Sequence, residues 1–111
     1  MRIQKEYDLG PDPLKTKELD TGNWNLNSTV SISVAHGLVL ADIRECEAWI
    51  RNDVATELFP IDHSDGLVNP DGKIKVDATD VVLTKRVGGL FSGVDWDSVA
   101  YNRGWIQLRY R

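Results

Sequence analysis

The sequence predicts a small all-β domain, an antiparallel β-sandwich of six to seven short strands. One segment, TVSIS, alternates apolar and hydroxyl side chains strictly, which is typical of a half-buried strand. Turn residues recur about every 8–12 residues, the spacing expected of a sandwich or barrel. A chain of 111 residues is long enough for one domain. Two packed sheets would let each strand bury one face.

The first part of the chain divides into an arm, an edge strand and a core strand. Gly10, Pro11 and Pro13 interrupt any ladder, so residues 1–13 are predicted to be an N-terminal arm or linker and residues 14–111 the sandwich. The polar segment 14–21 contains lysines, which suit an edge strand. In the next strand, three β-branched residues are predicted to face the core: Val30, Ile32 and Val34. Gly37 is predicted to end the strand with a positive φ.

The segment IRECEAWIRND fits two structures. Ile43, Cys46 and Ile50 have helical spacing. Cys46, Ala48 and Ile50 also alternate as in a strand, with Trp49 on the opposite face. We predict a strand, because the neighbouring segments are strands that need pairing partners.

The second half of the chain contains further strand segments, among them a short run, 73–76, that is apolar at alternate positions. A weak strand, 55–61, is interrupted by Pro60, and the dense turn that follows, 62–72, contains two Asp-Gly pairs typical of hairpins. Segment 80–87 is predicted to turn Val81 and Leu83 inward. The terminal strand, 105–110, is predicted to turn three side chains inward: Ile106, Leu108 and Tyr110.

Composition argues against several classes of function. The net charge is −4, from 13 basic and 17 acidic residues, whereas proteins that bind nucleic acid usually carry a basic face. We therefore interpret Arg103, Arg109 and Arg111 as a solvated face. No apolar run approaches the roughly 20 residues of a membrane helix, so no membrane insertion is expected. The first residues lack the apolar core of a signal peptide.

Isolated polar residues do not define a catalytic or metal site. Asp62, His63 and Asp65 could hold a metal ion, but a turn rich in aspartate explains them better, and we predict no metal and no cofactor. His36 is interpreted as a structural hydrogen-bonding residue. The single cysteine, Cys46, has no internal disulfide partner and is interpreted as a small buried apolar residue.

Aspartates flank a tryptophan in the loop before the last strand. Asp95 and Asp97, on either side of Trp96, could hold a sugar ring or form an acid–base pair for glycoside cleavage. Loop solvation is the favoured explanation, and no sequence motif for catalysis is present. We therefore predict a protein that is not an enzyme, with a polysaccharide hydrolase as the alternative.

Two tryptophans are predicted to face away from the core. Trp49 and Trp105 each fall on the opposite side of their strand from the apolar residues that should be buried. Exposed tryptophans often mark an interface or a stacking platform. We favour subunit contact for this pair.

The order of several motifs resembles small β-rich domains at the C-termini of phage and prophage tail-associated, tail-fibre-like proteins. The resemblance covers residues 14–110 and is carried by a G-N-W-N-L turn, a strand ending in HGL, an I-R strand, a T-x-V-x-L strand and a terminal N-R-G-x-I-x-L-x-Y, at 22–26, 36–38, 43–44, 79–83 and 102–110. It implies an oligomeric surface module, a location in the virion or in the cytoplasm before assembly, and binding to cell-surface carbohydrate. It transfers no catalytic residue.

Two hypotheses follow from these observations. The first is a tail-associated structural and receptor-binding module in which loop aromatics stack on sugar rings and loop polar groups bind hydroxyls, using Trp96, Tyr101, Asp95, Asp97 and Asn102. The alternative is a purely structural oligomerisation module without a small-molecule ligand. In that case Trp49 and Trp105 pack against neighbouring subunits. A trimer is the favoured oligomer, because it would fit a tail-fibre-like module with a three-fold axis.

Overall fold

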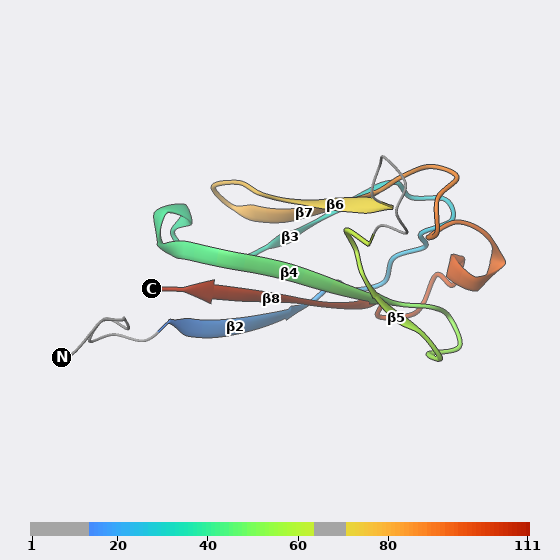
Figure 1. The fold of residues 1–111 in the computed structure, drawn as a ribbon, viewed down its shortest axis with the longest axis horizontal. Helices are drawn as coiled ribbons and strands as arrows, with labels where there is room; N and C mark the ends of the chain where they lie inside the picture. Colours follow the sequence, from blue (N-terminus) through green and yellow to red (C-terminus); the bar gives the residue numbers. More distant parts are fainter. Residues whose placement is uncertain (1–13, 64–70) are drawn as a thin grey trace.

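The domain consists of two antiparallel sheets that pack as a sandwich. The structure, a computed structural model, describes residues 14–63 and 71–111. One sheet has four strands in the order β2-β8-β4-β5, and the other has three in the order β3-β7-β6 (Figure 1). Their bounds are Lys15–Asp20 for β2, Gly104–Tyr110 for β8, Ile43–Arg51 for β4, Leu58–Pro60 for β5, Ser31–Ala35 for β3, Asp80–Lys85 for β7 and Gly72–Val76 for β6. The predicted all-β sandwich is confirmed.

The four-stranded sheet is built around β8. This strand pairs with β2 on one side and β4 on the other, so Ile106 lies between Leu19 and Ala48. Strand β2 lies at the sheet edge, as its lysines predicted. The ambiguous segment IRECEAWIRND is a strand, since β8 and β5 satisfy its backbone groups on both sides.

The three-stranded sheet is built around β7. Val81 and Leu83 are fully buried, as predicted. Strand β3 is shorter than expected: it begins at Ser31, and Val30 is 43% exposed, so the prediction that Val30 lies in the core is wrong. Ile32 and Val34 pack against the core but are only partly buried, because β3 is an edge strand. Gly37 has the predicted positive φ, +68°.

The core lies between the sheets and is closed at one end by aromatic rings. Ile50, Ile106 and Leu108 face it from one sheet, opposite Val81 and Leu83 of the other. Three aromatic residues are buried with them: Trp24, Phe91 and Trp96. Tyr110 lies on the same face of β8 as Ile106 and Leu108, as predicted, but it is only half-buried because it is the last residue of the strand.

Two short 3₁₀ helices complete the described part of the chain: Leu40–Asp42 and Val94–Trp96, labelled η1 and η2. Residues 14–63 and 71–111 contain no helix long and apolar enough to cross a membrane. The predicted arm, 1–13, and the turn residues 64–70, which include Asp65, lie outside the described residues.

Candidate functional site

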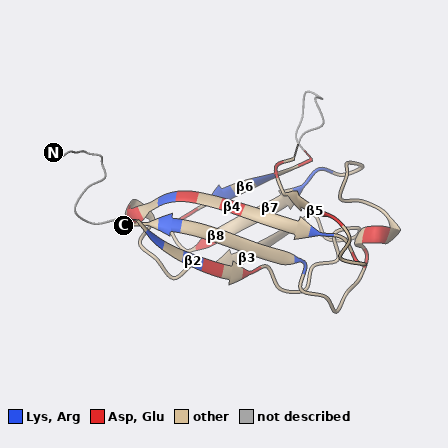
Figure 2. Ribbon diagram, turned by 60° about the horizontal axis from the view of Figure 1, so that its bottom comes forward, with Lys and Arg blue, Asp and Glu red and all other residues tan. Residues whose placement is uncertain are grey.

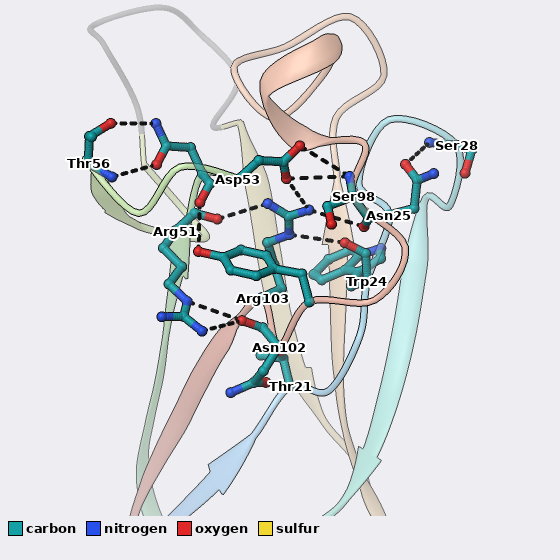
Figure 3. Close-up of polar contacts among 12 residues, drawn as sticks. Thr21, Trp24, Asn25, Ser28, Arg51, Asp53, Thr56, Ser98, Asn102 and Arg103 are labelled. Atoms are coloured by element: carbon teal, nitrogen blue, oxygen red, sulfur yellow. Dashed lines mark hydrogen bonds and ion pairs between the residues drawn. The ribbon is translucent and has the colours of Figure 1, made fainter.

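The loop with the predicted sugar-binding residues lies at one end of the sandwich, where it is joined to two other segments by Arg103 (Figure 3). The Arg103 side chain is fully buried. Its Nε donates to the Trp24 carbonyl at 3.0 Å, and its Nη1 donates to the Arg51 carbonyl at 3.0 Å. Its Nη2 lies 2.8 Å from a carboxylate oxygen of Asp53.

The position of Arg103 explains why it is buried. It immediately precedes β8, and its planar guanidinium group carries a fork of donors that reaches several acceptors at once. The acceptors come from the segment before β3, from the end of β4 and from the loop before β8, where the Ser98 carbonyl lies 3.4 Å from Nη2. A buried charge needs such pairing. The interpretation of Arg103 as a solvated residue is therefore wrong, whereas Arg109 is exposed.

Tyr101 belongs to the same cluster. Its hydroxyl donates to the Asn52 carbonyl at 2.8 Å. The guanidinium carbons of Arg51 and Arg103 lie 4.6 and 4.9 Å from its ring centre. These contacts give Tyr101 a structural role between two loops and occupy the hydroxyl that a sugar would otherwise use.

Trp96 is not available as a stacking platform. The residue is 4% exposed, and its ring meets Phe91 edge to face, with centroids 5.0 Å apart and planes at 90°. The helix η2 turns this side chain into the core, which local alternation could not indicate. Stacking of a sugar on Trp96 is incompatible with this packing.

The polar members of the predicted site are brought to the same end and divide into two groups. The side-chain oxygen of Asn102 accepts the Gly22 amide at 2.9 Å, and its backbone carbonyl accepts from Arg51. Asp95 and Asp97 are exposed on either side of the buried Trp96. At this end of the domain, hydrogen bonds therefore hold the loops together, and two carboxylates are exposed to solvent.

The histidines have structural partners. His36 is fully buried; its Nδ1 accepts the Leu38 amide at 3.0 Å, which leaves Nε2 to donate to the Asp77 carbonyl at 3.0 Å. The predicted structural role of His36 is confirmed. His63 lies 2.9 Å from Asp71. Within the described ranges, no three residues of the ligating types are grouped to hold a metal ion.

Asp71 is the centre of a clasp that joins β6 to the loop after β7. It contacts Arg86 at 2.8 Å and accepts the Leu90 amide at 3.1 Å. Burial alone would raise the pKa of Asp71, but the hydrogen bonds from His63, Leu90 and Arg86 outweigh it and hold the pKa below its usual range.

The open face of the four-stranded sheet carries the second predicted site. Trp49 and Trp105 lie directly opposite each other in the register of β4 and β8, and both are half-buried, whereas Ala48 and Ile106 on the inner face are fully buried. The prediction that the two tryptophans point away from the core is confirmed. The Trp49 indole N–H donates to Glu47 on the same face at 3.2 Å.

We name this surface the tryptophan face. Besides the two tryptophans, the alternation and register of its strands place there Thr16, Glu18, Asp20, Glu45, Glu47, Arg51, Leu58, Pro60, Gln107 and Arg109. Figure 2 shows β4 and β8 side by side: charged residues occur along β4 as far as Glu47 and again at Arg51, whereas Arg109 is the only charged residue of β8.

Two of the hollows among the described residues open on the tryptophan face. One, of about 370 Å³, is lined by Glu45, Cys46, Glu47, Gln107 and Arg109. The other, of about 260 Å³, is lined by Arg51, Ala55, Thr56, Glu57, Leu58 and Trp105.

Burial, together with the charge of Glu47, raises the pKa of the Cys46 thiol to about 11, so Cys46 is a protonated, unreactive thiol at neutral pH.

Protein-family models, curated proteins and solved structures were each compared with the chain, and none of the three comparisons gave a match.

Proposed function

We propose that this domain is a non-catalytic structural module of a phage or prophage tail, and that it associates with other protein copies through the tryptophan face. The observation that carries the proposal is the pair of half-buried tryptophans, Trp49 and Trp105, in register on a sheet face that no other element among residues 14–63 and 71–111 covers. Paired aromatic residues within a polar rim are characteristic of protein interfaces. The tail context is supported by the motif order described above.

The size of the face indicates a weak contact for a single domain. Strands rise about 3.3 Å per residue and lie about 4.8 Å apart, so the seven residues of β8 and the four strands give a footprint of about 23 by 19 Å. A standard interface buries roughly 800 Å² per partner, about twice this footprint. We therefore expect reversible association that depends on concentration and is strengthened by repetition in an assembly.

The test is the double substitution Trp49→Ala and Trp105→Ala, with self-association measured by sedimentation velocity. The matched control is Val94→Ala, which shortens an apolar side chain that is 79% exposed and lies outside the tryptophan face. We expect the tryptophan variant to lose self-association and the control to keep it. Equal association of both variants would refute the role of the tryptophan face.

A second function, carbohydrate binding, is favoured by the hollow beside Trp105. At about 260 Å³ it is large enough for one sugar ring, and Arg51, Thr56 and Glu57 supply hydrogen-bonding groups next to an aromatic side chain. In this site the aromatic residue that contacts the sugar is Trp105 and not Trp96. Asp95 and Asp97 remain exposed at the same end of the domain.

Glycan-array binding of the Thr56→Val variant separates the two functions. Loss of glycan binding with unchanged self-association would assign the hollow to a sugar. Retention of glycan binding by Trp105→Ala would exclude the hollow as the sugar site.

A further inference from the structure

The outer face of the three-stranded sheet complements the tryptophan face in charge. Its members, placed by strand alternation and register, are Ser31, Ser33, Ala35, Lys73, Lys75, Asp80, Val82 and Thr84, and we name it the lysine face. It carries two lysines and one carboxylate, whereas the tryptophan face carries four carboxylates and two arginines. The two faces lie on opposite sides of the sandwich (Figure 1).

The charged groups of the two faces also match in spacing. Lys73 and Lys75 are both exposed, two residues apart on one side of β6. Glu45 and Glu47 are both exposed, two residues apart on one side of β4, and line the larger hollow. Residues two apart in a strand are separated by about 7 Å, so one pair of lysines can meet one pair of glutamates along two aligned strands.

The side-chain sizes match as well. The lysine face presents small side chains along its edge strand, at Ser31, Ser33 and Ala35, all of them exposed. Facing sheets pack about 10 Å apart with interdigitating side chains, so small residues on one face leave room for large residues on the other. Trp49 and Trp105 are the large residues that such a surface would receive.

We propose that the occupant of the tryptophan face is the lysine face of a second copy of this chain, with Lys73 and Lys75 paired to Glu45 and Glu47. The inference rests on the proposed function, because it names the partner surface for the same face. Pairing the tryptophan face with itself would oppose two acidic surfaces, which is unfavourable. Contact between opposite faces is heterologous, so it builds a stack of copies instead of the trimer that the sequence analysis favours.

Charge reversal on each face tests this pairing in solution. One variant combines Lys73→Glu with Lys75→Glu, and the other combines Glu45→Lys with Glu47→Lys. Each alone opposes like charges in the contact, and we expect its association constant to fall at least about tenfold. An equimolar mixture restores opposite charges at every contact, so it should assemble like the unmodified protein. The control, Lys15→Glu with Arg111→Glu, changes the net charge as much as the lysine variant does but lies outside both faces.

The outcomes separate this inference from the proposed function. If the lysine variant assembles as the unmodified protein does, the tryptophan face has another partner, and only the inference is overturned. If both variants dissociate and the mixture does not recover, the effect is not one of pairing, and the inference is again overturned. If the unmodified protein never associates, the proposed function and the inference both fail.

Discussion

Arg103 gives the sharpest prediction about the fold, because one side chain joins three segments. Replacing it with leucine keeps most of the aliphatic stem and removes the guanidinium group. The change leaves the Asp53 carboxylate, which is 18% exposed, without its cation. It also removes the donors to the carbonyls of Trp24 and Arg51.

The expected loss can be estimated from these contacts. Removing one partner of a buried ion pair costs about 3–5 kcal/mol. Each buried carbonyl left unpaired costs about 1–3 kcal/mol more, although these terms do not add fully where water can enter. We expect Arg103→Leu to lower the free energy of unfolding by about 3–5 kcal/mol, a large share of the roughly 5–15 kcal/mol typical of a domain.

Equilibrium urea unfolding, followed by far-ultraviolet circular dichroism, measures this loss. The matched control is Arg109→Leu, whose ion pair with Glu45 is 3.5 Å long and has side chains 58% and 65% exposed. A surface pair of this kind contributes about 0–1 kcal/mol. The loss in free energy of unfolding for Arg103→Lys should lie between those for Arg103→Leu and Arg109→Leu, because lysine keeps the positive charge but lacks the planar fork of hydrogen-bond donors. A loss below about 1 kcal/mol for Arg103→Leu, equal to that of the control, would refute the structural role of Arg103.

Three further substitutions test other parts of the structure. Gly104→Ala should lower the melting temperature sharply in a thermal scan, because the new Cβ would meet the backbone carbonyl oxygen of Trp49; an unchanged melting temperature would contradict the close packing of β8 on β4. The lowered pKa of Asp71 means that its contribution to stability is present above the unfolded-state pKa and is lost as pH falls through the folded-state pKa. Asp71→Asn should therefore lower stability at neutral pH and flatten the acid limb of a stability–pH curve; parallel acid limbs for the two proteins would count against the clasp. Burial lowers the pKa of Lys85, so the unfolded state binds more protons and stability rises with pH through that lowered pKa. Lys85→Met should be more stable than the unmodified protein in urea at neutral pH, and a less stable variant would show that the contact of Lys85 with Ser92 outweighs its burial.

Regular strands were predictable because alternation fixes which side chains face the core. Val81, Leu83 and Ile106 are buried for that reason, and Trp49 and Trp105 lie outside by the same rule. The rule holds only while a strand continues and is covered on that side. The alternation rule fails for Val30, because Val30 precedes the first residue of an edge strand.

The loop residues were less predictable, because tertiary contacts decide where their side chains point. Trp96 enters the core through a single helical turn, and Arg103 turns inward because backbone carbonyls from distant segments converge there. Neither arrangement has a periodic signal in the sequence. The proximity of Asn102 to Gly22, which are far apart in the chain, likewise depends on the pairing of whole strands.

Solution mass tests the central claim most directly. Multi-angle light scattering of the unmodified protein, from about 10 μM to about 500 μM, covers the affinity expected of a small interface. We predict a mass that rises with concentration to several times that of one 111-residue chain and returns to the single-chain mass on dilution. A single-chain mass throughout this range would contradict self-association through the tryptophan face.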